Sequence, residues 1–344
     1  MNTIKEQIVT PTKQIYGLDY LRAIACIFVV AFHSSPILMD LWYARALHVF
    51  IFASAVPIFI LISLFLTELK IAKPNYLIKK SYRLGKIYIL WGWLIPFVFF
   101  IIAQLTSVSN KEFSDIINGQ SIYELIINGA NWSYKVYGIY FLVYLVVLSW
   151  IYRWLSPYMK SYSQMQKLFY AFCLINLLLP FFPQSYQVLR ESCSPFLVYL
   201  PLAKILNYDY QKGINYQQKA IRFAFIYIVV AILEAGIIAM SNRVEFITYN
   251  YAPYSRLSIV FLALCLVYIS LTITQKLSSR SNFLSLVSSC SLGIYLIHGF
   301  LIDYLRTLEL NYSSSLSFLT VFSLSVIFAA VIKELPYVKQ ILTL

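Results

Sequence analysis

The stretch YGLDYLRAIACIFVVAFH, residues 16–33, is the first long apolar segment of the chain, and it carries three polar groups. Eleven steps along an α-helix turn through about 1,100°, which is three turns plus roughly 20°. Arg22 and His33 therefore share one helix face, about 16 Å apart along the axis, and Asp19 lies one turn before Arg22. A charged group inside a bilayer costs roughly 2.5–3.5 kcal/mol on insertion scales, so such groups rarely persist there without a role. The stretch predicts a transmembrane helix with one functional face.

The composition of the whole chain agrees with a membrane protein. Of the 344 residues, 60% are hydrophobic and only 12% are charged, whereas a soluble domain has about 25% charged residues. We therefore expect an all-α, polytopic integral membrane protein. The net charge of +13 fits cationic loops that fix the topology better than it fits a nucleic-acid partner. Five scattered cysteines and three histidines predict neither a disulfide framework nor a metal site.

Apolar runs of spanning length predict about ten transmembrane helices. Two of the runs are short and interrupted by proline, which membrane helices tolerate where they pack inside protein. With ten spans, 19 of the 27 Lys and Arg residues fall in segments on the side of the two termini and 7 on the opposite side. This bias places both termini in the cytoplasm. The predicted spans are 15–36, 44–66, 87–105, 137–155, 168–183, 195–209, 221–241, 254–274, 284–305 and 316–334.

These boundaries predict a simple domain organisation. Residues 1–14 form a cytoplasmic N-terminal tail, residues 15–334 a single transmembrane domain, and residues 335–344 a cytoplasmic C-terminal tail. The longest outside loop, about 106–136, has an amphipathic stretch that would lie on the membrane surface or cover a cavity.

His33 is the first candidate for chemistry. An imidazole titrates near pH 6.5, so it can act as a general base with little adjustment. A histidine that only bonds to a neighbouring helix is the alternative, and Asp19 and Arg22 on the same face make that alternative weaker.

A second polar stripe lies on the ninth predicted span. Ser291, Tyr295 and His298 are spaced at i, i+4 and i+7, which places them on one helix face. They would suit a polar cavity shared with the first helix, or a structural polar seam between helices. Two further polar residues within spans, Glu234 and His48, would serve either a proton pathway or a neighbouring side chain.

The third feature is the basic segment 79–88, KKSYRLGKIY, at the cytoplasmic mouth of the third span. Its four cations form a good electrostatic site for phosphates. Topology alone, or contact with anionic lipid, would also explain them.

These motifs together resemble the acyltransferase-3 family of membrane O-acyltransferases. Arg22 and His33 resemble the family's Arg-x10-His signature, and Lys80 to Tyr88 resembles its basic Arg-x-x-Arg-Leu element, with Lys80 in place of an arginine and Lys86 in place of a proline. Residues 138–142, GIYFL, resemble its aromatic-Phe-Leu motif. Ser291 to His298 resembles its late Ser-x-x-x-Tyr-x-x-His motif. The size of the chain is most similar to stand-alone bacterial members of the intercellular-adhesin type, which acylate surface polysaccharides.

The resemblance implies transfer of an acyl group, commonly acetyl from acetyl-CoA, to a hydroxyl of a cell-surface or lipid-linked carbohydrate. It implies an enzyme in the bacterial cytoplasmic membrane, with acyl-CoA as donor substrate, no tightly bound cofactor, and association with polysaccharide-biosynthesis machinery. His33, Arg22 and Asp19 would be catalytic. The donor-binding residues would be Lys80, Arg83 and Lys86, and the cavity would be completed by Ser291, Tyr295 and His298.

A different class of protein also fits part of the pattern. A polytopic transporter or flippase for a lipid-linked glycan would explain ten spans and buried polar groups. It would not need a basic loop beside an Arg-x10-His helix. Direct transfer and an acyl-enzyme intermediate both remain open at this point, because His33 could act as base or as nucleophile.

Overall fold

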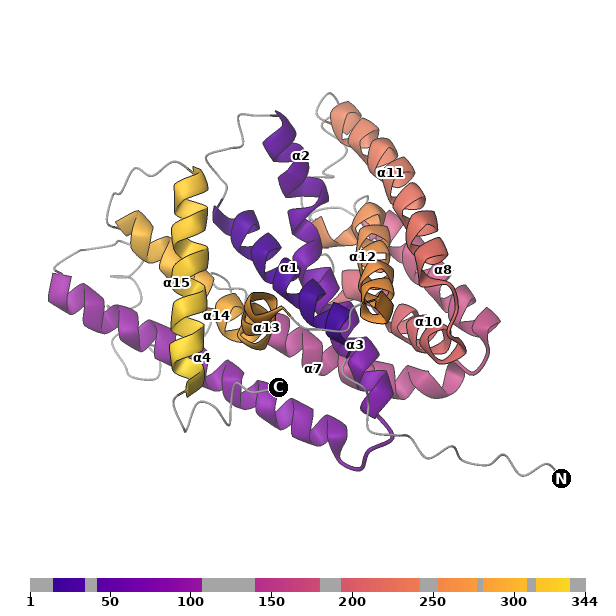
Figure 1. Cartoon of the computed structure of the whole chain (residues 1–344), viewed down its shortest axis with the longest axis horizontal. Helices are drawn as coiled ribbons and strands as arrows, with labels where there is room; N and C mark the ends of the chain where they lie inside the picture. The colour runs from indigo at the N-terminus through magenta and orange to yellow at the C-terminus, as the bar shows by residue number, and fades with distance from the viewer. Residues whose placement is uncertain are drawn as a thin grey trace.

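Helix α1 (Tyr16–Ser34) lies at the centre of the molecule, and most other helices are arranged around it (Figure 1). The computed structural model describes residues 15–34, 42–106, 140–179, 193–241, 253–276, 281–307 and 314–334, and the regular structure in these ranges is helical. The other helices are α2 (Trp42–Phe50), α3 (Ala55–Lys70), α4 (Tyr76–Thr106), α7 (Tyr140–Leu155), α8 (Tyr162–Leu178), α10 (Tyr199–Lys212), α11 (Tyr216–Ser241), α12 (Leu257–Lys276), α13 (Asn282–Ser289), α14 (Ser291–Thr307) and α15 (Ser314–Glu334).

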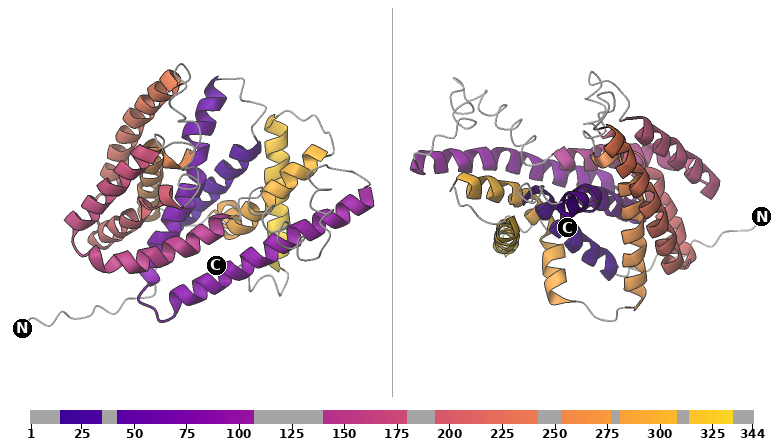
Figure 2. Two further views of the ribbon diagram at one scale, coloured as in Figure 1. Left: turned by 180° about the vertical axis from the view of Figure 1, so that it is seen from behind. Right: turned by 90° about the horizontal axis from the view of Figure 1, so that it is seen from above.

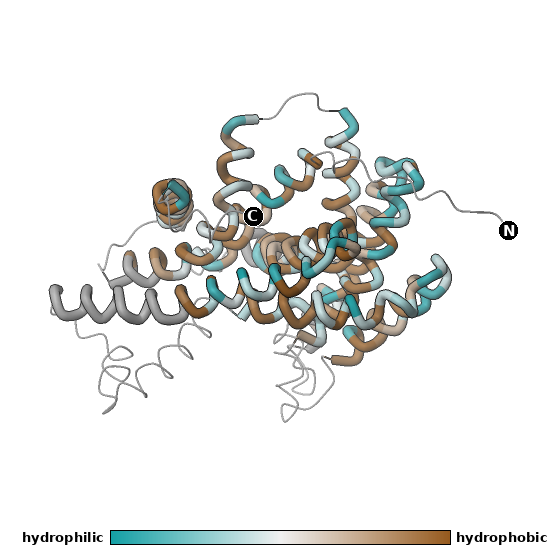
Figure 3. Tube along the Cα trace, turned by 90° about the horizontal axis from the view of Figure 1, so that it is seen from below, coloured by the Kyte–Doolittle hydropathy of each residue, from teal (hydrophilic) through white to brown (hydrophobic). Residues whose placement is uncertain are grey.

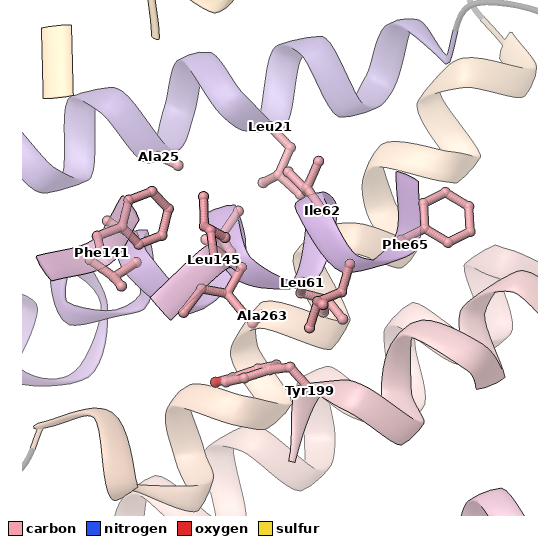
Figure 4. Packing of buried hydrophobic residues seen from close by; sticks show 14 of the residues in the cluster. Leu21, Ala25, Leu61, Ile62, Phe65, Phe141, Leu145, Tyr199 and Ala263 are labelled. Carbon is pink, nitrogen blue, oxygen red and sulfur yellow. The ribbon is translucent and has the colours of Figure 1, made fainter. Parts of the chain in front are cut away.

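The central position of α1 follows from its neighbours. It packs against α3, α12, α13, α14 and α15, while α10 packs on α3 and α11 runs along α12. Viewed from behind, α4 and α7 lie across one face of this bundle (Figure 2). The core between them contains Leu21 from α1, Leu61 from α3, Tyr199 from α10 and Ala263 from α12, all almost fully buried (Figure 4).

Two helices at the periphery present apolar side chains outward. On α11, Ile221, Phe225 and Ile232 are each more than 60% exposed, and on α15 Leu319 and Val331 are also well exposed. The hydropathy colouring shows apolar residues along the outer helices as well as in the core (Figure 3). A water-soluble protein rarely exposes such continuous apolar surface, whereas a bilayer accommodates it without cost. These faces are therefore suited to contact with lipid.

Six helical segments in the described ranges are long and apolar enough to cross a bilayer. The number becomes seven if α13 and α14, which meet at an angle of 71°, form one bent span. This is a polytopic membrane protein, but the predicted count of ten spans is not confirmed. The segment predicted at 195–209 forms α10, a helix of 14 residues that extends about 21 Å and is too short for a core of about 30 Å. The six segments are Tyr16–Ser34, Ala46–Lys70, Tyr140–Tyr158, Tyr216–Ile237, Leu257–Lys276 and Leu316–Glu334.

The predicted span 284–305 differs from the structure because the helix breaks at Cys290. The break lies in a run of three serines and a cysteine, which are weak helix formers. The Ser289 hydroxyl donates to the carbonyl of Leu286 at 2.8 Å and accepts from Lys333 Nζ at 2.8 Å. Such side-chain bonds compete with the helical backbone pattern. The break starts a new helix, α14, at Ser291.

Glu234 has a structural partner at the start of α12. Its carboxylate accepts from the backbone N–H of Ser258 at 3.2 Å and also from the Ser258 hydroxyl. The first N–H groups of a helix have no partner within the helix, and a carboxylate there is favourable. Of the two roles expected for Glu234, the structure shows the bond to a neighbouring residue, here at the start of α12.

The predicted tails, 1–14 and 335–344, and the loop 106–136 apart from its first residue lie outside the described residues.

Gly17 permits the close approach of α1 and α12. Its N–H donates to Thr274 Oγ1 at 2.8 Å, and a Cβ at this position would lie 1.7 Å from the carbonyl oxygen of Ser270. Small residues allow backbones to approach in this way between membrane helices. This contact fixes the C-terminal end of α12 against the first turn of α1.

We expect Gly17→Ala to destabilise the protein by about 1–3 kcal/mol, because the added methyl group would force the two backbones apart. The measurement is the apparent Tm of the purified protein in detergent. Gly236→Ala on α11 is the matched control, because a Cβ there would meet nothing within 4 Å. A Gly17→Ala protein that melts like the wild type would contradict the close approach.

Candidate active site

A cavity of about 420 Å³ lies beside α1, between α3, α4, α7 and the start of α14. Two features of the chain bring the helices to this cavity. One is the break at Cys290, after which α14 starts, and the other is the tight α3–α4 connection, where Asn75 has a φ of 58°. This left-handed conformation is one that asparagine tolerates better than most residues. The cavity is lined by Arg22, Phe59, Ile62, Ser63, Leu66, Lys70, Tyr76, Lys79, Lys80, Arg83, Leu84, Phe141, Leu145, Ser291, Leu292 and Tyr295.

The charge of the lining is entirely positive. Five of the lining residues are basic, namely Arg22, Lys70, Lys79, Lys80 and Arg83, and none of those lining residues is acidic. Low-dielectric walls strengthen the attraction of such a cluster for an anion. The cavity is therefore suited to a ligand with several negative charges.

Asp19 stands behind Arg22 and does not line the cavity. The Asp19 carboxylate lies 3.6 Å from the Arg22 guanidinium, in the i,i+3 pair that the sequence predicts. The two side chains are 13% and 21% exposed, respectively. The pair partly compensates the charge of Arg22 and holds its side chain at the cavity wall.

Lys80 is held inside the wall. Its side chain is buried, and Nζ donates to the hydroxyls of Ser63, Thr67 and Ser149 at 2.9, 2.7 and 2.9 Å. Arg83, one turn further along α4, lines the same cavity, and its buried Nε has no hydrogen-bond partner in the described structure. The two predicted donor-binding cations therefore have different surroundings.

His33 and His298 lie next to each other beyond the cavity. Their ring centroids are 5.2 Å apart with an interplanar angle of 43°. His33 is exposed, whereas His298 is 3% exposed. His298 Nδ1 lies 2.7 Å from the carbonyl oxygen of Tyr295, which assigns the proton to Nδ1 and leaves Nε2 as an acceptor. Tyr295 lines the cavity, and its ring lies 5.8 Å from the His298 ring, so this side chain connects the cavity lining to the pair of histidines.

The structure thus brings five of the nine predicted site residues to one cavity: Arg22, Lys80, Arg83, Ser291 and Tyr295. His33, His298 and Asp19 are immediately behind these residues. Lys86 is not part of the cavity lining; it is exposed, and its Nζ lies 4.3 Å from the centre of the Tyr82 ring. His48 is stacked on Phe32 at 4.1 Å and does not line the cavity.

The lining residues that were not singled out from the sequence as site residues include Lys70, Tyr76 and Phe59. Lys70 ends α3 and Tyr76 starts α4, so they meet only because the connection between these helices is tight. Phe59 contacts Phe141 and Tyr295, with ring centroids 6.1 and 6.2 Å away. Lys70 is close in sequence to the basic segment 79–88, and this proximity could have indicated that it belongs to the same site. No sequence motif included the aromatic residues of α3.

A basic cavity next to a pair of histidines in a helical membrane protein fits both a membrane-bound transferase and a transporter of charged substrates. The comparison with known families decides between these. A family model described as an acyltransferase domain, that of the acyltransferase-3 family, matches residues 15–334. The chain belongs to this family, and it is a membrane acyltransferase. No curated protein and no solved structure matches the chain.

We expect inorganic pyrophosphate to raise the Tm of the purified protein, and the increase to shrink as NaCl is raised, because counter-ions screen the five cations. Arg83→Met should lose much of this stabilisation. Lys167→Met, a change at an exposed position on α8, should keep it. Equal stabilisation of the wild type and the Arg83 variant would contradict an anion site in this cavity.

Proposed function

We propose that the protein transfers an acetyl group from acetyl-CoA to a hydroxyl of a cell-surface or lipid-linked carbohydrate, as a multi-pass protein of the bacterial cytoplasmic membrane. Membership of the acyltransferase-3 family supports acyl transfer. The observation that carries the proposal is the basic cavity in which Arg22 of α1, Arg83 of α4 and Tyr295 of α14 meet, with two histidines beyond it. The resemblance of the sequence in size to intercellular-adhesin-type members is the reason for proposing a surface polysaccharide as acceptor and an association with polysaccharide-biosynthesis machinery.

The donor is proposed to enter from the side of the basic segment. Acetyl-CoA carries several phosphate charges at one end and a thioester at the other, which matches a cavity lined by cations and by the aromatic residues Phe59, Phe141 and Tyr295. Arg22 and His33 are about 16 Å apart along α1, a distance comparable to part of the pantetheine arm. The thioester would then lie near Tyr295 and the histidines while the phosphates stay among the cations.

His33 is proposed as the general base. It would remove the proton from the acceptor hydroxyl as the hydroxyl oxygen attacks the thioester carbonyl. The carbon–sulfur bond then breaks, and the thiolate of CoA takes up the proton from the His33 imidazolium, so that the products are an ester and CoA thiol. Arg22, paired with Asp19, would orient the donor or stabilise the negative charge that develops on the carbonyl oxygen. Attack by His33 itself, through an acyl-histidine, is the second route of the same chemistry.

We expect His33→Ala to lower the rate of acetyl transfer by about 10²–10⁴-fold, the usual contribution of a general base. The assay is turnover of acetyl-CoA by the purified protein in nanodiscs with a polysaccharide acceptor. Because His33 is exposed, added imidazole should restore part of the activity of the alanine variant. Unchanged polysaccharide acylation in the variant would overturn the proposed role. Loss of glycan export with acylation intact would instead indicate a transporter.

His298 is expected to act through His33. His298→Asn keeps a polar side chain that can donate a hydrogen bond but removes the ring that lies beside His33. We expect a fall in kcat of about 10-fold or more with little change in KM for acetyl-CoA, because orientation of the base matters in the transition state. The His33→Ala, His298→Asn double variant should be no slower than His33→Ala alone. Additive losses in the double variant would show that the two histidines act independently.

A further inference from the structure

We propose that Lys70, Lys79 and Arg83 hold the phosphates of the donor, whereas Lys80, the first cation of the Lys80 to Tyr88 element, is a positioning residue that fixes the cavity wall. This inference rests on the proposed function for the identity of the ligand, a nucleotide-bearing thioester. It differs from the expectation drawn from the sequence, in which Lys80 itself faces the phosphates.

The hydrogen bonds of Lys80 are fully used within the protein. A lysine ammonium has three N–H donors, and the three bonds to Ser63, Thr67 and Ser149, at 2.7–2.9 Å, account for all of them. The Lys80 side chain is 8% exposed. A phosphate could contact it only by replacing one of these bonds.

The partners of Lys80 are themselves oriented toward it. Thr67 donates its own hydroxyl proton to the carbonyl oxygen of Ser63 at 2.7 Å, and Ser149 donates to the carbonyl oxygen of Leu145 at 2.5 Å. Both hydroxyls therefore present lone pairs, not protons, to Lys80 Nζ. The cluster requires a compact donor with three diverging N–H groups, and an arginine, whose donors lie in one planar fork, does not supply this geometry.

The cluster joins three walls of the cavity. Lys80 is on α4, Ser63 and Thr67 are on α3, and Ser149 is on α7. Ser63, Lys80 and Leu145 all line the cavity. Loss of the ammonium would leave buried hydroxyl oxygens unsatisfied and release α4 from α3 and α7, so its effect would reach the whole cavity.

The remaining cations are placed for direct contact. Arg83 lines the cavity with a buried Nε that has no hydrogen-bond partner in the described structure, and an anion in the cavity would supply one. Lys70 and Lys79 line the cavity from the last turn of α3 and the first turn of α4. The two lysines thus approach from two helices joined by a short connection, as a clamp for a doubly charged group would require.

The test compares binding of two probes, CoA and phosphate-free pantetheine, by isothermal titration calorimetry, and turnover of their acetyl thioesters. Lys70→Met, Lys79→Met and Arg83→Met should each raise the Kd of CoA about tenfold, with pantetheine binding and Tm unchanged. Lys73→Met is the matched control, because Lys73 is an exposed cation in the same connection that does not line the cavity. It should leave both constants unchanged.

Lys80 should behave differently in the same assays. Lys80→Arg and Lys80→Met should both lower the Tm and reduce kcat with acetyl-CoA and S-acetylpantetheine to a similar extent, because the wall and not the phosphate contact is lost. Thr67→Val should reproduce part of this loss, and the Thr67→Val, Lys80→Met double variant should be no worse than Lys80→Met. A Lys80→Arg protein with wild-type kcat and stability, or Lys80 effects confined to the Kd of CoA, would overturn the inference.

The outcomes separate this inference from the proposed function. If the wild type binds CoA but transfers no acetyl group, the proposed function fails while the Kd values still decide the roles of the cations. If the wild type transfers acetyl and the Lys70, Lys79 and Arg83 variants bind CoA normally, the assignment of the cations fails alone. Absence of CoA binding by the wild type would overturn both.

Discussion

The central constraint on this structure is the burial of α1 among five other helices while it carries a guanidinium on one face. Arg22 cannot face lipid without a large cost, so it requires a polar space inside the protein. The cavity between α1, α3, α4, α7 and α14 supplies that space, and Asp19 compensates part of the charge. The close contact of Gly17 with α12 fixes where α1 lies. The position of the cavity follows from these two requirements together.

The polar groups within the helical bundle fall into two kinds. Some are completed by the protein itself: Glu234 accepts from the first turn of α12, and Lys80 donates to three hydroxyls. Such groups fix helices relative to one another, because a buried polar group that loses its partner is costly. Arg83 is of the other kind, because its buried Nε at the cavity has no hydrogen-bond partner in the described structure. This difference, and not the charge of a residue, separates the groups that organise the site from those available to a ligand.

The break at Cys290 has a direct consequence for the site. It starts α14 at Ser291, so that Ser291 and Tyr295 reach the cavity while His298, one further turn along, lies beside His33. The aromatic residues Phe59, Phe141 and Tyr295 form the apolar end of the cavity. The lining therefore changes from cationic to aromatic toward the histidines, as a substrate with a charged end and a neutral reacting end would require.

The sequence by itself determined the features that depend on local periodicity. Helical spacing predicted that Asp19, Arg22 and His33 share a face and that Ser291, Tyr295 and His298 do so, and apolar runs predicted a polytopic helical protein. The tertiary structure decided which of these faces meet. It placed His298 against His33, brought Lys70 and Tyr76 into the cavity, left Lys86 outside it and buried Lys80 among hydroxyls. Contacts between α1 and α14 join residues as much as 265 positions apart, as where the Cys26 thiol donates to the backbone carbonyl of Ser291. Such contacts arise from how helices pack and where they break, and the period of a single helix carries no information about either.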